Sequence, residues 1–164
     1  MHTHTPTAQD TEDFGWQLAS ARPAGSHGFA VIYLSGELGT GKTTFARGFM
    51  RALGVTEPVR SPTYMLVELY GAGELTVVHV DLYRLRTPAE LEHLGLREWA
   101  TDKSVWLIEW PERAGGRLPP PDLQLSLTAA PTGHDIEVSP RSVAGRAWLA
   151  QLTGREGAGQ PEGA

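Results

Sequence analysis

Residues 36–43 read GELGTGKT, a full match to the pattern G-x-x-x-x-G-K-[ST]. An apolar run over residues 29–34, typical of a buried strand, precedes them, and residues 43–53 then repeat apolar side chains at helical spacing. Glycines in such a turn let successive backbone N–H groups face phosphate oxygens, and the start of the following helix adds positive potential. This order of strand, glycine-rich turn and helix predicts a P-loop that binds a nucleotide.

Two side chains supply the chemistry of this loop. We expect Lys42 to reach the β- and γ-phosphates, and Thr43 to ligate Mg²⁺, a hard ion that prefers oxygen ligands. The chain contains no asparagine and therefore lacks the Asn-Lys-x-Asp box of guanine-specific P-loop proteins, which favours ATP. The predicted ATP-binding residues of the loop are Gly36, Gly39, Thr40, Gly41, Lys42, Thr43 and Thr44.

Two carboxylates at strand ends are the candidate catalytic and metal-binding acids. Glu109 ends the apolar run 105–108, as the acid of a Walker B strand does, and Asp81 ends the run 77–80. Alternation along the second strand places His79 on the same face as Asp81. A lone strand histidine is more often a hydrogen-bonded structural residue, so we assign His79 no direct chemistry. Structural interpretations of both acids, as a strand end or a turn cap, stay open.

Residues 61–64 read SPTY and lie between the P-loop helix and the next strands. Ser61, Pro62 and Thr63 occupy the place where many P-loop proteins keep a switch that responds to the γ-phosphate. A plain proline turn explains the same residues, and both interpretations stay open.

The remaining pattern predicts a single α/β P-loop domain whose mostly parallel sheet is flanked by helices and carries an inserted antiparallel hairpin. The predicted hairpin strands cover residues 65–70 and 75–82, and later strands cover 105–108, 123–128 and 135–139; helices are predicted at 11–21, capped by Asp10 or Thr11, at 88–94 after Thr87, and at 142–152. Arg47 and Arg51, four apart on the P-loop helix, mark either a docking stripe or a solvated face.

The domain boundaries follow from where apolar periodicity begins and ends. We expect a flexible N-terminus over residues 1–9, a P-loop ATPase domain over 10–153 and a disordered tail over 154–164. The composition is globular, with 40% hydrophobic residues, and 14 basic against 19 acidic side chains give a net charge of −5, which does not attract nucleic acid. Cysteine is absent, and no apolar run is long enough to span a membrane. We therefore expect a soluble cytoplasmic protein with no membrane partner.

Four segments together resemble the TsaE (YjeE) family, ATPases of bacterial tRNA threonylcarbamoyladenosine synthesis. They are residues 36–45, 59–64 (VRSPTY), 79–85 (HVDLYRL) and 108–113 (IEWPER), and the resemblance runs from about residue 11 to residue 152. It implies a P-loop fold with ATP and Mg²⁺ as cofactors and an ATPase activity that is weak alone. It also implies that this activity drives or resets a complex of the TsaD and TsaB proteins, with tRNA contacted only through that complex.

The resemblance also implies roles for single residues. Thr43 and Glu109 correspond to Mg²⁺ ligands and Asp81 to the catalytic carboxylate, while the choice between Asp81 and Glu109 for polarising water stays open. Relatives often carry Arg after Gly in the loop before the last strand, near the adenine, whereas here His134 stands there and can stack on the base. The alternatives are a small-molecule or nucleoside kinase with the same P-loop, although no lid segment is apparent, and a nucleotide-gated binding module.

Overall fold

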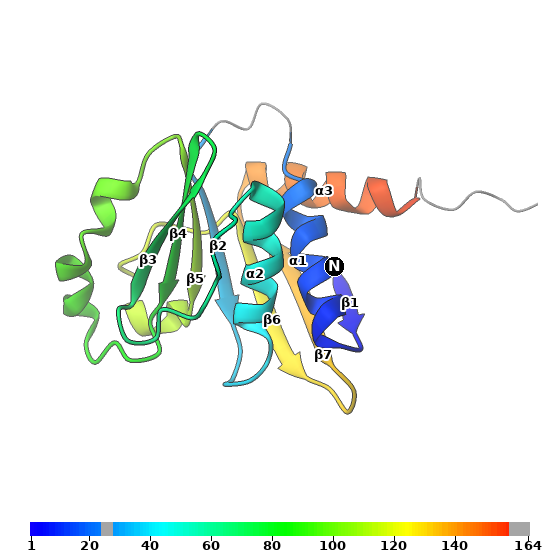
Figure 1. Cartoon of the computed structure of the whole chain (residues 1–164), viewed down its shortest axis with the longest axis horizontal. Helices are drawn as coiled ribbons and strands as arrows, with labels where there is room; N and C mark the ends of the chain where they lie inside the picture. Colours follow the sequence, from blue (N-terminus) through cyan, green and yellow to red (C-terminus); the bar gives the residue numbers. More distant parts are fainter. Residues whose placement is uncertain (24–27, 158–164) are drawn as a thin grey trace, which may run out of the picture.

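A seven-stranded sheet in the order β1-β7-β6-β2-β5-β4-β3 forms the centre of the computed structural model, which describes residues 1–23 and 28–157 (Figure 1). The neighbours β6, β2, β5 and β4 are parallel, whereas β3 and the pair β7 and β1 add antiparallel edges. The predicted α/β fold and its hairpin are confirmed, and the sheet is mixed because both edges are antiparallel. The strands are β1 His2–Thr5, β2 Ala30–Ser35, β3 Val67–Ala72, β4 Leu75–Asp81, β5 Ser104–Glu109, β6 Leu123–Ala129 and β7 His134–Pro140.

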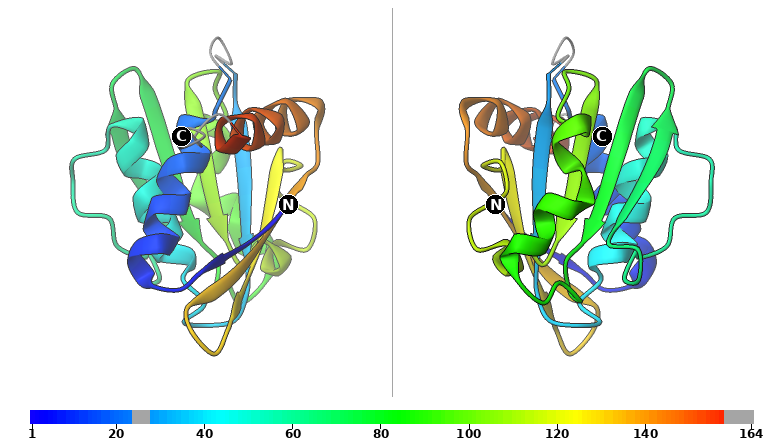
Figure 2. Two further views of the ribbon diagram at one scale, coloured as in Figure 1. Left: turned by 90° about the vertical axis from the view of Figure 1, so that its right-hand side faces the viewer. Right: turned by 90° about the vertical axis from the view of Figure 1, so that its left-hand side faces the viewer.

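Helices cover both faces of this sheet. The α-helices α1 (Ala8–Ser20), α2 (Lys42–Leu53) and α3 (Val143–Gly157) lie on one face, and the 3₁₀-helices η1 (Pro88–Leu94) and η2 (Leu96–Trp99) cover the other (Figure 2). A third 3₁₀-helix, η3 (Pro111–Ala114), follows β5. The segment predicted as a helix after Thr87 is thus of the 3₁₀ type, and it ends before Gly95 as expected. Among the described residues, no helix has both the length and the apolar character needed to cross a membrane.

The core on the α-helical face is built around a row of aromatic rings. Phe45 of α2 lies between Phe14 of α1 and Phe49, with ring centres 6.1 Å apart in both pairs, and Phe49 lies 6.0 Å from Trp148 of α3. Trp148 also donates a hydrogen bond from Nε1 to the Leu18 carbonyl oxygen at 2.7 Å. These contacts hold all three α-helices against the sheet and so fix the position of α2 behind the P-loop.

Helices α1 and α2 approach each other through two glycines. A Cβ atom on Gly48 would lie 1.8 Å from the Glu12 carbonyl oxygen, and one on Gly15 would lie 2.2 Å from the Phe45 carbonyl oxygen. Glu12 pairs with both Arg51 and Arg47, with 3.4 Å from its Oε2 to Arg47 Nη1. The arginine stripe on α2 is therefore engaged within the chain.

The N-terminus differs from the flexible segment expected over residues 1–9. Strand β1 pairs antiparallel with β7, and the terminal ammonium of Met1 donates to the Val138 carbonyl oxygen at 3.0 Å. Helix α1 begins earlier than predicted and is capped by Thr7, whose Oγ1 accepts from the Asp10 N–H in a capping box. Apolar periodicity cannot reveal such a strand, because it lies at a sheet edge and Thr5 alone is fully buried.

The C-terminal boundary of the folded domain also differs from the predicted one. Helix α3 continues to Gly157, so residues 154–157 of the expected disordered tail are helical, and the rest of that predicted tail lies outside the described residues.

Candidate nucleotide-binding site

The P-loop lies between the end of β2 and the start of α2, as the motif predicts. Two of its glycines are required by their surroundings. Gly36 has φ +141°, and a Cβ atom there would lie 2.2 Å from the Leu127 carbonyl oxygen. Gly41, the residue before α2, has φ +88°, and a Cβ atom there would lie 3.0 Å from the His134 ring. Larger residues at either position would change the path of the loop and the aim of its N–H groups.

The ammonium of Lys42 is held inside this loop. Its Nζ donates to the carbonyl oxygens of Gly36 at 2.5 Å and Glu37 at 2.7 Å, and lies 4.4 Å from the centre of the Trp110 ring. Burial lowers the pKa of Lys42, and the charges of Glu109 and Asp81 oppose that effect. A positive group is thus fixed where a bound polyphosphate would need one.

The Glu109 carboxylate is fixed from two sides. Thr43 Oγ1 donates to Glu109 Oε1 at 3.0 Å, and the His79 Nε2 atom lies 2.9 Å from the same oxygen. Glu109 is 3% exposed and His79 is fully buried. The P-loop threonine and the acid at the end of β5, both of which the sequence predicts beside the metal and the phosphates, are therefore in direct contact.

Asp81 connects strand β4 to the segment predicted as a switch. Its Oδ2 accepts from Ser61 Oγ at 2.5 Å and from Thr63 Oγ1 at 3.2 Å, and its Oδ1 accepts from the Tyr83 N–H at 2.9 Å. The backbone repeats this link, because the Asp81 N–H donates to the Leu66 carbonyl oxygen at 2.9 Å. Residues 61–66 are therefore attached to the end of β4 at several points.

The two acids lie side by side because of the sheet register. Asp81 and Glu109 are opposite each other in the parallel pair of β4 and β5, and β5 is in turn parallel to β2, which leads into the P-loop. Carboxyl ends of parallel strands share one edge of a sheet, where ligands of α/β proteins bind.

A cavity of about 380 Å³ opens at this edge. Most of the residues predicted from the sequence line it, whereas Gly36, Thr40 and Pro62 do not. Leu38, Tyr83 and Trp110 also line it and were not predicted as site residues. Trp110 directly follows Glu109 in the sequence, and this position next to a predicted site residue could have identified it as part of the site. The predicted residues in the lining are Gly39, Gly41, Lys42, Thr43, Thr44, Ser61, Thr63, Asp81, Glu109 and His134.

His134 is held at the cavity by hydroxyl groups from the N-terminal part of the chain. Its Nδ1 lies 3.1 Å from Thr11 Oγ1, which lies 2.8 Å from Thr5 Oγ1, and Thr5 Oγ1 donates to the His134 carbonyl oxygen at 3.2 Å. Strand β1 and helix α1 thereby position a ring that packs on Gly41.

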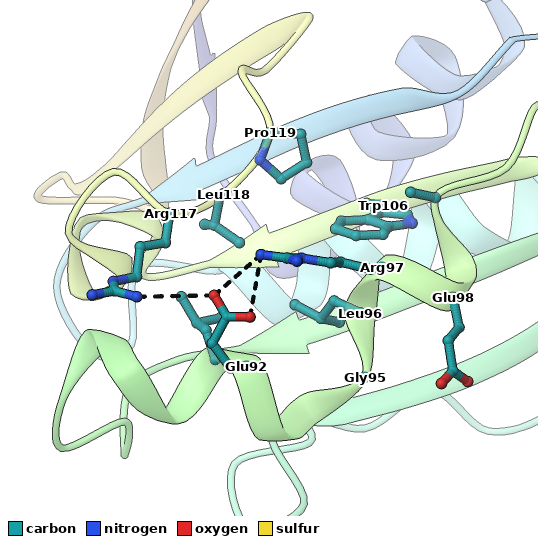
Figure 3. Close-up of a pocket in the computed structure, with 11 residues that line it drawn as sticks. Glu92, Gly95, Leu96, Arg97, Glu98, Trp106, Arg117, Leu118 and Pro119 are labelled. Carbon is teal, nitrogen blue, oxygen red and sulfur yellow. Dashed lines mark hydrogen bonds and ion pairs between the residues drawn. The ribbon is translucent and has the colours of Figure 1, made fainter.

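A larger cavity of about 440 Å³ lies under the 3₁₀-helices η1 and η2 (Figure 3). Its polar rim is occupied by ion pairs, because the Glu92 carboxylate lies 3.2 Å from Arg97 Nη2 and 3.9 Å from Arg117 Nη1. Trp106 lines the same cavity, and its Nε1 donates to the Trp99 carbonyl oxygen. The P-loop and both strand-end acids belong to the smaller cavity, which is therefore the candidate site.

The donors at the candidate site suit Mg²⁺. Within residues 1–23 and 28–157, no group of three or more His, Cys, Asp or Glu side chains could hold a metal ion alone. Mg²⁺ usually takes one or two protein oxygens and completes its octahedron with phosphates and waters. Thr43 Oγ1 and the Glu109 carboxylate, in contact and facing the cavity, provide such a pair.

Known proteins that are similar to this chain share one description. The sequence model of the family described as "Threonylcarbamoyl adenosine biosynthesis protein TsaE" matches residues 5–136. A Haemophilus influenzae relative named tRNA threonylcarbamoyladenosine biosynthesis protein TsaE is 42% identical over 108 residues, which cover 66% of this chain and 68% of the relative. Relatives of the same name are 35% identical in Treponema pallidum, over 82% of this chain and 96% of the relative, and 41% identical in Bacillus subtilis, over 61% and 62%.

One solved structure is also similar. The crystal structure of Bacillus subtilis YdiB superposes with a TM-score of 0.77 at 26% identity, and the match covers 95% of both chains.

Proposed function

Because the chain belongs to the TsaE family of tRNA threonylcarbamoyladenosine biosynthesis proteins, we propose that it is a Mg²⁺-dependent ATPase of that pathway. The observation that carries the proposal is the contact between the P-loop and the acid of β5, at 3.0 Å from Thr43 Oγ1 to Glu109 Oε1. A P-loop threonine bonded to a strand-end carboxylate is the arrangement that holds Mg²⁺ against a nucleoside triphosphate.

Different residues of the cavity have different roles in the proposed hydrolysis. Backbone N–H groups of the loop and the start of α2 bind the phosphates, and Lys42 leaves its two carbonyl partners to pair with the β- and γ-phosphates. The Thr43 hydroxyl donates a hydrogen bond to Glu109, which leaves the lone pairs of Thr43 Oγ1 free for a metal ion. Thr43 and Glu109 would hold Mg²⁺, which would supply positive charge to offset the negative charge that develops as the γ-phosphoryl group departs.

We assign Asp81 to the attacking water and Glu109 to the metal. Glu109 contacts the P-loop threonine, whereas Asp81 contacts the two hydroxyl groups of Ser61 and Thr63. A carboxylate attached to the segment that meets the γ-phosphate is suited to orient a water for in-line attack. Ser61, Pro62 and Thr63 then act as the switch, since γ-phosphate loss changes what this segment contacts.

ATP is the proposed nucleotide, with His134 at the base. The His134 ring packs on Gly41 at the mouth of the phosphate cradle and can stack on a purine. The absence of asparagine argues against the usual guanine-specific box.

The proposed partners are the TsaD and TsaB proteins, which the family resemblance implies. The nucleotide cycle drives or resets their complex, tRNA is contacted only through it, and the cytoplasmic location predicted from the sequence is part of this proposal. A switch segment bonded to a catalytic acid supports it, because binding of a partner to residues 61–66 would depend on the state of the nucleotide.

The test measures phosphate release from ATP with Mg²⁺, by the protein alone and with the TsaD and TsaB proteins of the same organism. We expect slow basal hydrolysis that the complex stimulates, and its loss in Lys42→Ala and Glu109→Gln. A matched control is Lys103→Ala, because Lys103 is the only other lysine and lies outside the cavity. Full activity in Lys42→Ala contradicts the site. Transfer of phosphate to small-molecule or nucleoside acceptors instead of water would establish the kinase alternative.

A further inference from the structure

His79 is a buried polar residue for which the proposed hydrolysis gives no role. It lies on β4, two residues before Asp81, and its side chain is fully buried. Its Nε2 lies 2.9 Å from Glu109 Oε1, whereas its Nδ1 has no hydrogen-bond partner among the described residues. A buried polar atom without a partner costs stability, so a replaceable structural residue would not be expected to carry one.

The surroundings of the two ring nitrogens of His79 indicate which of them carries the proton. A proton on Nδ1 would be a buried donor without an acceptor, and it would leave a lone pair on Nε2 facing the carboxylate oxygen of Glu109. With the proton on Nε2, the ring donates to Glu109, and only an acceptor lone pair is unsatisfied. His79 therefore acts as a hydrogen-bond donor to Glu109.

The residue at the end of β5 explains why a donor is needed. Walker B strands more often end in aspartate, and glutamate has one additional rotatable bond through which its carboxylate can move. In the sheet register, Asp81 is opposite Glu109, which makes His79 the diagonal neighbour of Glu109 on the adjacent strand. The two side chains meet across this diagonal, with 2.9 Å between His79 Nε2 and Glu109 Oε1. His79 and Thr43 together restrict the carboxylate through its Oε1 atom.

We propose that His79 is a positioning residue that fixes the Glu109 carboxylate for Mg²⁺. The inference rests on the proposed function, because it assigns the metal to Thr43 and Glu109. His79 contacts Oε1, and the Thr43 hydroxyl lies 3.0 Å from Oε1 and 3.4 Å from Oε2, so Oε2 is the less engaged oxygen and would meet the ion or one of its waters. Hydrogen-bond partners of this kind set the orientation of a metal ligand, and their loss lowers metal affinity or activity about 10- to 100-fold.

The test compares three substitutions at position 79 through metal binding. Mn²⁺ serves as the probe, and its affinity for the ADP-loaded protein is measured by electron paramagnetic resonance. His79→Leu fills similar volume without a donor, and we expect a loss of about 10- to 100-fold. His79→Gln places an amide N–H near the position of Nε2, so we expect it to keep most of the wild-type Mn²⁺ affinity. The side chain of His79→Asn is too short to reach Glu109, so we expect the same loss of affinity as in His79→Leu.

Two further measurements separate positioning from general damage. ADP affinity without metal is expected to be unchanged in all three variants, because His79 contacts Glu109 and not the phosphate cradle. In a Glu109→Gln background, His79→Leu should cause no additional loss of Mn²⁺ affinity. If His79→Leu does not fold, the Mn²⁺ affinities of His79→Gln and His79→Asn are compared instead, and a higher affinity in His79→Gln supports the inference.

The inference is overturned by wild-type Mn²⁺ affinity in His79→Leu, by equal losses in the glutamine and asparagine variants, or by a parallel fall in metal-free ADP affinity. Failure of the proposed function looks different, because it appears in the wild-type protein as absent ATP hydrolysis in the presence of TsaD and TsaB. A wild-type protein that binds ADP but does not bind Mn²⁺ would refute the assigned metal site and this inference together.

Discussion

The ammonium nitrogen of Lys42 lies 4.4 Å from the centre of the Trp110 ring, so the P-loop cation is covered by the residue that directly follows Glu109. Trp110 has φ +60°, which is unusual for a residue other than glycine, and its N–H donates to the Leu34 carbonyl oxygen at 3.2 Å. The strand end that carries the acid thus turns sharply and places an indole ring over the cavity.

Nucleotide binding should therefore change the fluorescence of Trp110. When Lys42 leaves the Gly36 and Glu37 carbonyl oxygens for a phosphate, the cation over the indole moves and the polarity around the ring changes. Titration with ADP and with a non-hydrolysable ATP analogue, read by tryptophan emission, measures this. The chain has five tryptophans, so Trp110→Phe is the control. A full signal in Trp110→Phe would contradict the prediction.

Asp81→Asn should separate hydrolysis from binding. The amide cannot act as a base or hold the charge-assisted bonds to Ser61 and Thr63, so we expect hydrolysis to fall about 100-fold or more. ADP affinity should stay near that of the wild type, because the phosphate cradle is intact. Steady-state kinetics and calorimetric ADP titration measure the two quantities.

The matched control is Asp102→Asn, at an exposed position between η2 and β5. Unchanged hydrolysis in Asp81→Asn would move the water-orienting role to Glu109.

The P-loop was predictable because its whole signal is local. Strand, glycine turn and helix follow one another within residues 29–53, and the structure reproduces each of them with small shifts of boundary. The hairpin of β3 and β4 was predictable for the same reason, since its two strands flank a short loop.

Other parts of the site depend on residues distant in the sequence. Thr11 and His134 are 123 positions apart, and nothing local marks them as partners. Strand β1 is short, polar and half-exposed, and its pairing with β7 was invisible to periodicity. The contact of His79 with Glu109 needed the register of β4 against β5, which a sequence pattern does not contain.

The contact between α1 and α2 should be intolerant of any side chain at position 48. In Gly48→Ala, the new Cβ would meet the Glu12 backbone at 1.8 Å, so the helices must separate. We expect a loss of about 3 kcal/mol in the free energy of unfolding, at the upper end for overpacking. Urea denaturation measures it. Gly71→Ala is the control, because a Cβ atom there has nothing within 4 Å, and a comparable loss in both variants would contradict the prediction.

Two tyrosines, the half-buried Tyr33 and the buried Tyr70, should make the fold sensitive to alkaline pH. Burial raises the pKa of Tyr33 to about 12, and burial with a hydrogen bond to Glu68 does the same for Tyr70, from a usual value of 10.0. Because the folded pKa values exceed the unfolded ones, this contribution is fully present below pH 10.0 and is lost as pH rises through about 12.

Urea denaturation across that pH window measures the slope. Tyr33→Phe combined with Tyr70→Phe should make the decline of stability with pH shallower. An identical slope in the double variant would show that other groups cause the alkaline loss.

Thr11→Val should weaken nucleotide binding more than it weakens the fold. Valine keeps the shape of threonine but removes the hydroxyl that contacts both His134 Nδ1 and Thr5 Oγ1, so the His134 ring is no longer fixed against Gly41. The loss of one such hydrogen bond, about 1 kcal/mol, corresponds to roughly a fivefold weaker ADP affinity. Calorimetric titration with ADP measures it, and Thr3→Val on the same strand β1 is the control. If Thr11→Val and Thr3→Val bind ADP equally well while His134→Ala does not, the ring works without its hydroxyl partners, and β1 has only a structural role.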